Sequence, residues 1–334
     1  MRVVTIGASA GGVEALTVLA AGLPGDLQAA LFVVLHTTPK GYSVLPEILA
    51  RAGNLPAEHP VDSQKIESGR IYVAPPDLHL LVSKGQVHLS HGPRENGFRP
   101  AVDPLFRSAA SAYDGAAIGV VLSGNLADGA AGLRAIKDNG GHTIVQDPAE
   151  APFQSMPTSA LEMGPVDFTL PVDQIGPTIA RLVSARTVEL PRTRKPRTQG
   201  ERAMLSKHPD SQPSPFACSE CHGTLWELAS DVPQFRCRVG HGYSLTGLVD
   251  AQDDAVERAI WAAVRSLEEN RSLRRRLAED AEKRNQAFIA RLFRNRAQER
   301  EQHAEVLRAL LVEVQSIARK QARKAPAKPR SKRA

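Results

Sequence analysis

The stretch Val3-Val4-Thr5-Ile6-Gly7-Ala8-Ser9-Ala10-Gly11-Gly12 decides the fold of the first half of the chain. A β-branched run opens into a glycine-rich turn, and an alanine-rich segment (13–21) follows, which predicts strand, tight turn and helix. Residues 7–11 read G-x-S-x-G, an arrangement that exposes a serine hydroxyl beside backbone amides. A phosphate loop is disfavoured, because neither the dinucleotide fingerprint nor the P-loop pattern is complete. Ser9 is therefore a candidate nucleophile.

Length and composition set the class of protein. The 334 residues predict two or three folded units, and the 42% hydrophobic content is enough for a sizeable core. The sequence shows no apolar run long enough to cross a membrane and no signal peptide pattern, so a cytoplasmic protein without membrane insertion is expected. The three cysteines, an odd number, argue against a disulfide framework.

Short apolar runs alternate with helix-like segments from residue 1 to about 184. This alternation predicts an α/β domain, a doubly wound and mostly parallel sheet with helices on both faces, plus an appended β-hairpin around residues 83–85. The expected strands are 3–6, 30–35, 70–74, 79–82, 86–89, 117–122, 142–145 and 168–170, and the expected helices are 13–23, 43–52, 102–113 and 128–139.

The remaining chain divides by composition. Residues 185–216 are rich in proline and arginine and are expected to form a disordered linker. A small cysteine-bearing unit occupies 217–247, and 248–318 predicts one long helix or a helical hairpin. Along this segment Val256, Ile260, Val264, Leu267, Leu273, Leu277 and Ala281 approximate an apolar stripe, which suggests self-association, a partner helix or packing on its own domain. The end, 319–334, is a basic tail expected to be disordered.

Two further residues are placed where catalysis in an open sheet occurs. His36 ends the apolar run 30–35, and Asp128 follows the strand 117–122, so both join Ser9 on loops after strands. In a hydrolytic triad, histidine takes the serine proton and a buried carboxylate fixes the imidazole tautomer. Asp128 could instead cap the helix that follows it. The other candidates are the histidines His59, His79, His88 and His91 and the acids Asp103 and Asp147.

The chain order Ser9, His36, Asp128 differs from the serine, acid, histidine order of α/β-hydrolases. That order, with residues 7–12, Leu35-His36 and the Asp-Gly-Ala close of 124–130, resembles the catalytic domain of the chemotaxis protein-glutamate methylesterase (CheB) family. Supporting stretches are 71–79, 99–106, 146–148 and Met156-Pro157.

The resemblance covers about residues 1–184 and implies a triad of Ser9 nucleophile, His36 base and Asp128 orienter. It implies hydrolysis of γ-glutamyl methyl esters on chemoreceptors with release of methanol, and glutamine deamidation as a second activity. No catalytic cofactor is needed for ester hydrolysis through an acyl-enzyme. The backbone amides of Ala10 and Asn125 are candidate oxyanion donors. Arg99 is a candidate contact for an acidic receptor surface, with a solvated arginine as the alternative.

Several positions depart from the family pattern. Ala10 stands where threonine usually follows the nucleophile, Gly124-Asn125-Leu126 replaces Gly-Met-Gly, and Ser155 replaces a glycine. Only Met1 and Arg2 precede the first strand, whereas well-known members carry a phosphorylatable receiver domain there. The sequence thus suggests a stand-alone form whose regulation comes from elsewhere.

Cys218-x2-Cys221 and Cys237-x3-His241 form two pairs separated by fifteen residues. This spacing predicts a closed, tetrahedral zinc ribbon that stabilises the small unit and does not catalyse. His222 is the rival fourth ligand, and Trp226 and Phe235 are the expected core of the ribbon.

Three hypotheses for function follow. The first is a methylesterase acting on a methyl-accepting receptor or a receptor-like signalling protein. The second is a degenerate esterase domain that serves as a signalling scaffold through its ribbon and helix. The third is nucleic-acid binding through the ribbon and basic tail, which the lack of aromatic residues in that tail disfavours.

Overall fold

The computed structural model describes residues 1–37, 43–185, 211–228 and 233–323, and side chains as far as residue 312. Contacts divide the chain into two compact units, Met1–Ala251 and Gln252–Ala334. Along the part of the chain so described, no helix combines the length and apolar character needed to span a membrane.

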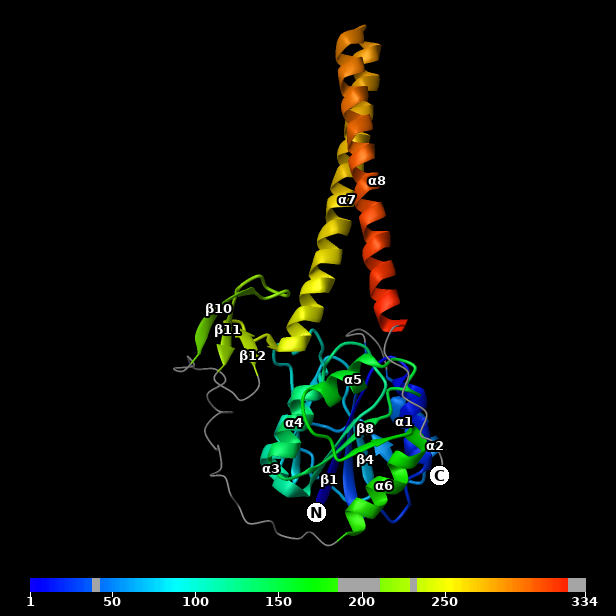
Figure 1. Cartoon of the computed structure of the whole chain (residues 1–334), viewed down its shortest axis with the longest axis vertical. Coiled ribbons are helices and arrows are strands. Elements are labelled where there is room, and N and C mark those ends of the chain that lie inside the picture. The colour runs from blue at the N-terminus through cyan, green and yellow to red at the C-terminus, as the bar shows by residue number, and fades with distance from the viewer. Residues whose placement is uncertain (38–42, 186–210, 229–232, 324–334) are drawn as a thin grey trace, which may run out of the picture. The chain divides into compact units, whose positions relative to one another are not determined.

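The first unit contains a seven-stranded sheet in the order β3-β4-β2-β1-β7-β8-β9, with every neighbouring pair parallel. Figure 1 shows β1, β4 and β8 among the helices of this unit. β1 lies at the centre because its residues, most of them apolar, are buried on both faces of the sheet. The strands are β1 (Arg2–Ala8), β2 (Ala29–Leu35), β3 (Ala57–Glu58), β4 (Arg70–Val73), β7 (Ala117–Val121), β8 (His142–Gln146) and β9 (Phe168–Leu170).

Helices cover both faces of this sheet, because successive side chains of each strand point to opposite sides. Val4 and Ile6 pack in one core with three of the helices, and Val3 packs in the other core with the remaining three and the hairpin. The first set is α1 (Gly12–Ala21), α2 (Leu45–Ala52) and α6 (Val172–Ser184). The second is α3 (Val102–Tyr113), α4 (Ala130–Asp138) and α5 (Ser155–Glu162), with β5 (His79–Ser83) paired to β6 (Gln86–Ser90).

The predicted α/β class with a mostly parallel sheet is confirmed. Four elements of the α/β region were not expected from the sequence: β3, α5, α6 and a short 3₁₀-helix, η1 (Asp114–Ala116). α5 and α6 contain Pro157 and Pro177, and proline within a segment disfavours a helix. Pro157 lies in the first turn of α5, where a missing amide hydrogen costs nothing, whereas Pro177 lies inside α6 and tertiary packing of Ile175 and Ile179 compensates.

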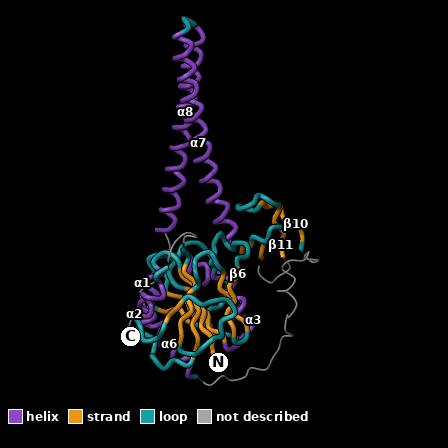
Figure 2. Tube along the Cα trace, turned by 180° about the vertical axis from the view of Figure 1, so that it is seen from behind, coloured by secondary structure: helices purple, strands orange, loops and turns teal. Residues whose placement is uncertain are grey.

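The cysteine-bearing region is a four-stranded antiparallel sheet (Figure 2). Its strands are β10 (Gln212–Ala217), β11 (Thr224–Leu228), β12 (Gln234–Cys237) and β13 (Gly242–Ser244). β10 corrects the expected linker, because residues 212–216 form an edge strand, a position that tolerates Pro213 and Pro215. The greater part of that linker, residues 186–210, lies outside the described residues.

The core of this small sheet differs from the expected one. Leu225, Phe235, Tyr243 and Leu248 pack together with Cys218 and Cys237. The prediction for Trp226 is wrong, because its side chain is 38% exposed. Leu225 and Trp226 are consecutive on β11 and therefore point to opposite faces, so only one of them can face the core.

The second unit is a helical hairpin in which α8 (Ala287–Arg323) runs back along the second part of α7 (Leu245–Lys283). Ala290, Ala297, Ala304 and Leu311 are buried at seven-residue spacing, which is the repeat of a coiled-coil seam. The predicted apolar stripe is wrong at Val256, Leu273 and Leu277, which are exposed, because small alanine side chains form the contact instead. Inter-helix ion pairs join Arg271 and Arg275 to Glu301, Arg294 to Glu282, and Arg308 to Glu268.

α8 continues into the region expected to be a disordered tail, as far as Arg323. Residues 324–334, the rest of that tail, lie outside the described residues.

Candidate active site

Ser9 and His36 lie side by side where two neighbouring parallel strands end. β1 pairs with β2 so that Ala8 is opposite Leu35, and the amide of His36 donates to the carbonyl of Ala8 at 3.1 Å. Ser9 and His36 are the next residues in this register, and neighbouring strands are about 4.8 Å apart. The sheet therefore brings the candidate nucleophile and the candidate base to the same edge.

The turn that carries Ser9 is fixed from two sides. The Ser9 amide donates to the carbonyl of Ser123 at 3.0 Å, and Gly11 adopts a φ of 70° that starts α1. Gly124 approaches so closely that a Cβ there would lie 2.1 Å from the Met156 sulfur and 2.8 Å from the Ser9 Cβ. The Ser9 side chain therefore packs directly against the loop that follows β7.

The imidazole of His36 is held by one hydrogen bond and one ring contact. Its Nε2 is 2.8 Å from Oδ2 of Asp128, and its side chain is 3% exposed. The ring of Phe98 stacks on it at 3.6 Å between centroids. Nδ1 is buried and has no hydrogen-bond partner in the described part of the chain. Nδ1 is thus the ring nitrogen that Asp128 does not engage.

No hydrogen bond joins Ser9 Oγ to His36 among the residues that the structure describes. In the absence of substrate, nucleophile–base contacts are often longer than they are during the reaction. The structure therefore brings Ser9 and His36 together through the strand register, and His36 and Asp128 together through a direct hydrogen bond.

Asp128 is a fully buried carboxylate with four donors. Besides His36, it accepts from the Val102 amide at 2.6 Å, the Asp103 amide at 3.1 Å and Nδ2 of Asn96 at 3.0 Å. Burial alone would raise the pKa of Asp128, but its hydrogen bonds, that from His36 foremost, hold the pKa below its ordinary value. Asp128 is therefore an anion that can fix the imidazole tautomer and support its positive charge.

The alternative in which Asp128 caps the helix that follows it is wrong. The residue before α4 is Gly129, and no side chain caps that helix. Asp128 instead accepts from the first amides of α3, where the positive end of the helix dipole favours a carboxylate.

Asn96 is a site residue that sequence reasoning missed. Its Nδ2 donates to Oδ1 of Asp128 and to Oδ2 of Asp103, each at 3.0 Å. Asn96 and Gly97 have φ values of 50° and 82°, and Glu95 and Phe98 exchange backbone hydrogen bonds across them. The dipeptide Asn-Gly is the sequence signal for such a tight turn, and it would have located this turn but not its partners.

Asp103 is a second buried carboxylate beside Asp128. Its Oδ1 accepts from the Gly132 amide at 2.7 Å. Burial, together with the charge of Asp128, raises the pKa of Asp103 to about 7, although Arg107 opposes this. The pair therefore divides its roles, with Asp128 ionised and Asp103 taking up a proton near neutral pH.

We expect the contribution of Asp103 to the free energy of unfolding to fall as pH rises from about 4 to about 7, because the folded chain keeps a proton on Asp103 that the unfolded chain loses near its ordinary pKa of 3.8. Asp103→Asn removes this contribution, so the variant should gain stability relative to the wild type as pH rises. Urea unfolding of both proteins at acid and neutral pH measures the difference. Asp26→Asn, at an exposed position, is the control. Equal pH dependence in all three proteins would contradict the expectation.

The other candidate histidines are engaged elsewhere. His59 contacts the carbonyls of Val73 and Ser43, His79 contacts that of Pro93, His88 contacts Ser83, and His91 pairs with Asp77. The competing acid Asp147 accepts from the Ala149 amide in a turn after β8. Among the described residues, none of these groups forms a hydrogen bond with the ring nitrogens of His36.

The candidate oxyanion donors lie on the loops that flank Ser9. Ala10 directly follows Ser9 in the turn, and its amide donates to no backbone carbonyl of the described residues. The same holds for Asn125, which follows Gly124. Because neither amide hydrogen is used by a backbone acceptor of the described residues, both remain candidate donors to an oxyanion.

The Arg99 side chain is engaged in hydrogen bonds within the protein. Its guanidinium donates twice to Oδ1 of Asp77, at 2.9 and 2.7 Å, and once to the Gly92 carbonyl at 2.8 Å. Its side chain is 14% exposed. These contacts favour a structural role over a free contact for an acidic surface, and they also differ from the solvated arginine that the sequence left as the alternative.

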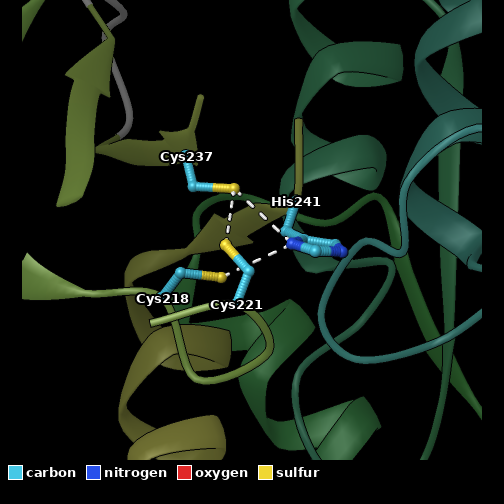
Figure 3. Close-up of side chains that lie close together, drawn as sticks. All are labelled: Cys218, Cys221, Cys237 and His241. Atoms are coloured by element: carbon cyan, nitrogen blue, oxygen red, sulfur yellow. Dashed lines mark hydrogen bonds between the residues drawn. The ribbon is translucent and has the colours of Figure 1, made fainter. Parts of the chain in front are cut away.

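A second cluster lies in the small antiparallel sheet (Figure 3). One ligand atom from each of Cys218, Cys221, Cys237 and His241 lies within 4.8 Å of the others. Nδ1 of His241 is 3.6 Å from the Cys218 sulfur and 3.5 Å from the Cys237 sulfur, and the Cys221 and Cys237 sulfurs are 3.6 Å apart. Tetrahedral zinc with ordinary bond lengths places such atoms about 3.5–3.8 Å apart. The four residues therefore fit a closed zinc site, and His222 lies outside the cluster.

The fold and the site define a class of protein. An open parallel sheet with serine, histidine and aspartate after β1, β2 and β7 is an arrangement of serine hydrolases, in a chain order different from that of α/β-hydrolases. A model of the CheB methylesterase family matches residues 4–179, more than half of the chain. The chain belongs to this family.

Three comparisons illustrate the match. A relative from Leptospira interrogans is 38% identical over 180 residues, which are 54% of this chain and 93% of that protein. Another, from Anaeromyxobacter dehalogenans, is named "Protein-glutamate methylesterase/protein-glutamine glutaminase 2" and is 42% identical over 52% of this chain and 51% of its own length. The crystal structure of the Thermotoga maritima CheB methylesterase catalytic domain is similar with a TM-score of 0.52 and 32% identity, over 54% of this chain and 98% of that one.

Proposed function

We propose that the chain hydrolyses methyl esters of glutamate side chains on methyl-accepting chemoreceptors or receptor-like signalling proteins, and releases methanol. The observation that carries this proposal is the placement of Ser9, His36 and Asp128 at one edge of the sheet in a chain of the CheB methylesterase family. The names of the relatives, protein-glutamate methylesterases, supply the substrate class.

The reaction proceeds through an acyl-enzyme. Nδ1 of His36 takes the proton of Ser9 Oγ as the oxygen attacks the ester carbonyl, and Asp128 supports the imidazolium that forms. The amides of Ala10 and Asn125 donate hydrogen bonds to the negatively charged oxygen of the tetrahedral intermediate. His36 then protonates the departing methoxide, and water, activated by the same histidine, releases the glutamate. These steps use no cofactor.

Deamidation of glutamine follows from the same groups. Attack of Ser9 on a side-chain amide gives the same acyl-enzyme, with ammonia as the leaving group. The relatives' names join protein-glutamine glutaminase to the esterase activity, and this favours the second activity here.

We propose in addition that the four-residue cluster holds one structural zinc ion. The three cysteines form no disulfide among the described residues and act together as ligands, which fits a reducing compartment and therefore the cytoplasm. Four protein ligands leave no open position, so the ion stabilises the small sheet. Self-association through the hairpin of α7 and α8 stays a prediction, for which the exposed Phe288 and Val306 are candidate contacts.

The zinc proposal distinguishes His241, the proposed fourth ligand, from His222, which lies outside the cluster. His241→Ala removes a ligand, so we expect zinc content to fall well below one ion per chain, whereas His222→Ala should retain about one. Elemental analysis of the purified full chain after dialysis measures both. Zinc loss in the His222 variant with retention in the His241 variant would reverse the assignment.

The esterase proposal is tested with the full chain and a receptor fragment that carries glutamate methyl esters. We expect methanol to accumulate and the fragment to lose one methyl group per ester, as followed by gas chromatography and mass spectrometry. The same fragment without methyl esters is the control. Binding of the methylated fragment without any methanol would support the scaffold hypothesis and contradict this one.

A further inference from the structure

The small antiparallel sheet, called the metal-bearing sheet below because it carries the proposed zinc site, contacts the Glu95–Phe98 turn beside the triad. Both lie inside the compact unit Met1–Ala251. The Asn96 amide donates to the Gly242 carbonyl at 2.9 Å, and the Gly242 amide donates to the Arg94 carbonyl at 3.3 Å, so β13 extends onto this segment. The Glu95 carboxylate pairs with Arg107 of α3 at 2.6 Å and with Arg236 of β12 at 3.4 Å. Backbone and charged contacts therefore join the small sheet to the esterase domain.

The side chain of Asn96 connects this contact to Asp128. Its Oδ1 accepts from the Ser244 amide of β13 at 3.1 Å, while its Nδ2 donates to Asp128 and to Asp103. The residue is 5% exposed. A Cβ on Gly247 would lie 2.3 Å from Oδ1, so the backbone just after β13 approaches this amide closely enough that only glycine fits there without a shift. Every polar atom of the Asn96 side chain is thus used, and its oxygen faces the small sheet.

The Ser244 amide hydrogen selects one orientation of the Asn96 amide. With Oδ1 on Ser244, the two hydrogens of Nδ2 point to Oδ1 of Asp128, an ionised carboxylate that can only accept, and to Oδ2 of Asp103, which accepts from the second hydrogen. The opposite orientation would set Oδ1 against those oxygens and leave the Ser244 donor without an acceptor. Asn96 and the Asp103 amide then occupy Oδ1 of Asp128, which leaves Oδ2 for Val102 and His36.

The metal ligands lie close to this contact along the chain. His241 directly precedes Gly242, the first residue of β13, and the Cys237 amide donates to the His241 carbonyl at 3.0 Å. Loss of the ion would release the segment that presents Ser244, because a sheet of this size has little core without its metal. Metal occupancy at the cluster and the orientation of Asn96 are therefore linked through the short run of backbone from His241 to Ser244.

We propose that Asn96 is a positioning residue for the Asp128 carboxylate, and that the metal-bearing sheet, through Ser244, makes esterase activity depend on zinc occupancy. The inference rests on the proposed zinc site and esterase activity. It gives the extension a regulatory role in the same chain, because a change in the metal cluster changes the group that orients His36.

The experiment is a cycle of four proteins: the full-length wild type and Asn96→Ala, each with zinc bound and after zinc removal by a chelator. Kinetics of methanol release give kcat and KM, and the downfield proton resonance of the His36–Asp128 hydrogen bond gives a readout that needs no substrate. Asn54→Ala, which removes an exposed asparagine side chain remote from the triad, is the matched control.

We expect Asn96→Ala to lower kcat about 10- to 100-fold with little change in KM, as outer partners of catalytic ligands commonly do. Zinc removal should lower the kcat of the wild type by a similar factor. It should lower the kcat of Asn96→Ala little further, because both changes act through the same side chain. The downfield resonance should shift in the variant and in the zinc-free wild type alike. The proposal would be overturned if zinc removal and Asn96→Ala lowered kcat by factors that multiply when the two are combined. It would also be overturned if Asn96→Ala left the resonance unshifted and kcat within twofold of the wild type.

Gly247→Ala is a second variant that keeps Asn96 and all four metal ligands. Its Cβ displaces Oδ1 of Asn96, so kcat should fall while zinc content and the circular dichroism spectrum stay those of the wild type. Unchanged kcat in this variant would also overturn the proposal. If the zinc-bound wild type releases no methanol while the resonance still shifts in the variants, the esterase proposal fails and the positioning role stands.

Discussion

Replacing Ser9 by alanine is expected to lower kcat for methyl ester hydrolysis by roughly a million-fold, the cost of removing the serine of a triad. Alanine has no oxygen to form the acyl-enzyme, so the groups around it can only polarise the ester for attack by water. The amides of Ala10 and Asn125 remain in place and should leave a small residual rate. Methanol release by the two proteins under identical conditions measures the loss.

The substitution should spare the fold. Ser9 packs against Gly124 through its Cβ, which alanine keeps, and its backbone hydrogen bond to Ser123 is unchanged. A fluorophosphonate probe should label the wild type at Ser9 and leave the variant unlabelled. Ser68→Ala, at an exposed serine, should behave as the wild type in both assays. Equal methanol release by wild type and Ser9→Ala would refute the triad.

The positions of Ser9 and His36 could be predicted because they depend on local pattern. Each follows a β-branched or apolar run, and parallel strands end at one edge, so strand ends alone bring the two together. The expected hairpin has the same basis, since two short runs flank a tight turn at Gly85. Periodicity and turn residues therefore suffice for the sheet and for the loops that carry the site.

Asn96, Phe98 and Asp103 could not be placed in the same way. Their roles depend on contacts across the fold, with Asn96 distant in sequence from both Asp128 and Ser244. The Asn-Gly signal predicts the turn that ends at Phe98, but only tertiary structure shows that Phe98 stacks on His36. The pKa of Asp103 is raised by burial and by the charge of Asp128, neither of which a sequence displays.

The C-terminal half shows the limit of apolar patterns. Leucine and valine on α7 predicted the stripe, yet alanines form most of the contact, and of the predicted leucines and valines only Val264 is fully buried. Small side chains let the two backbones approach, which leaves Val256, Leu273 and Leu277 exposed. The spacing of cysteines and histidine is more informative than hydrophobicity in the small sheet, since metal geometry fixes those four positions directly.

Asp128→Asn is expected to lower kcat about ten-thousand-fold, as replacement of a triad aspartate by asparagine does elsewhere, and to leave the site's geometry intact. The carboxylate accepts from the Val102 amide, the Asp103 amide, Asn96 and His36. An asparagine at position 128 has an NH2 group, which can only donate and therefore needs an acceptor among these four groups. Three of them can only donate toward it, whereas Nε2 of His36 can become an acceptor.

The NH2 group introduced by Asp128→Asn would therefore donate to Nε2 of His36 and drive the ring proton to Nδ1. In the proposed mechanism Nδ1 receives the proton of Ser9, so the variant would hold the imidazole in the wrong tautomer. The pH profile supplies the check: loss of Asp128, an anion at neutral pH, should make the residual activity rise with alkaline pH, where hydroxide can replace the base. Asp147→Asn, which keeps the acceptor for Ala149, is the matched control and should retain full activity. A kcat for Asp128→Asn within tenfold of the wild type would assign the orienting role to another group.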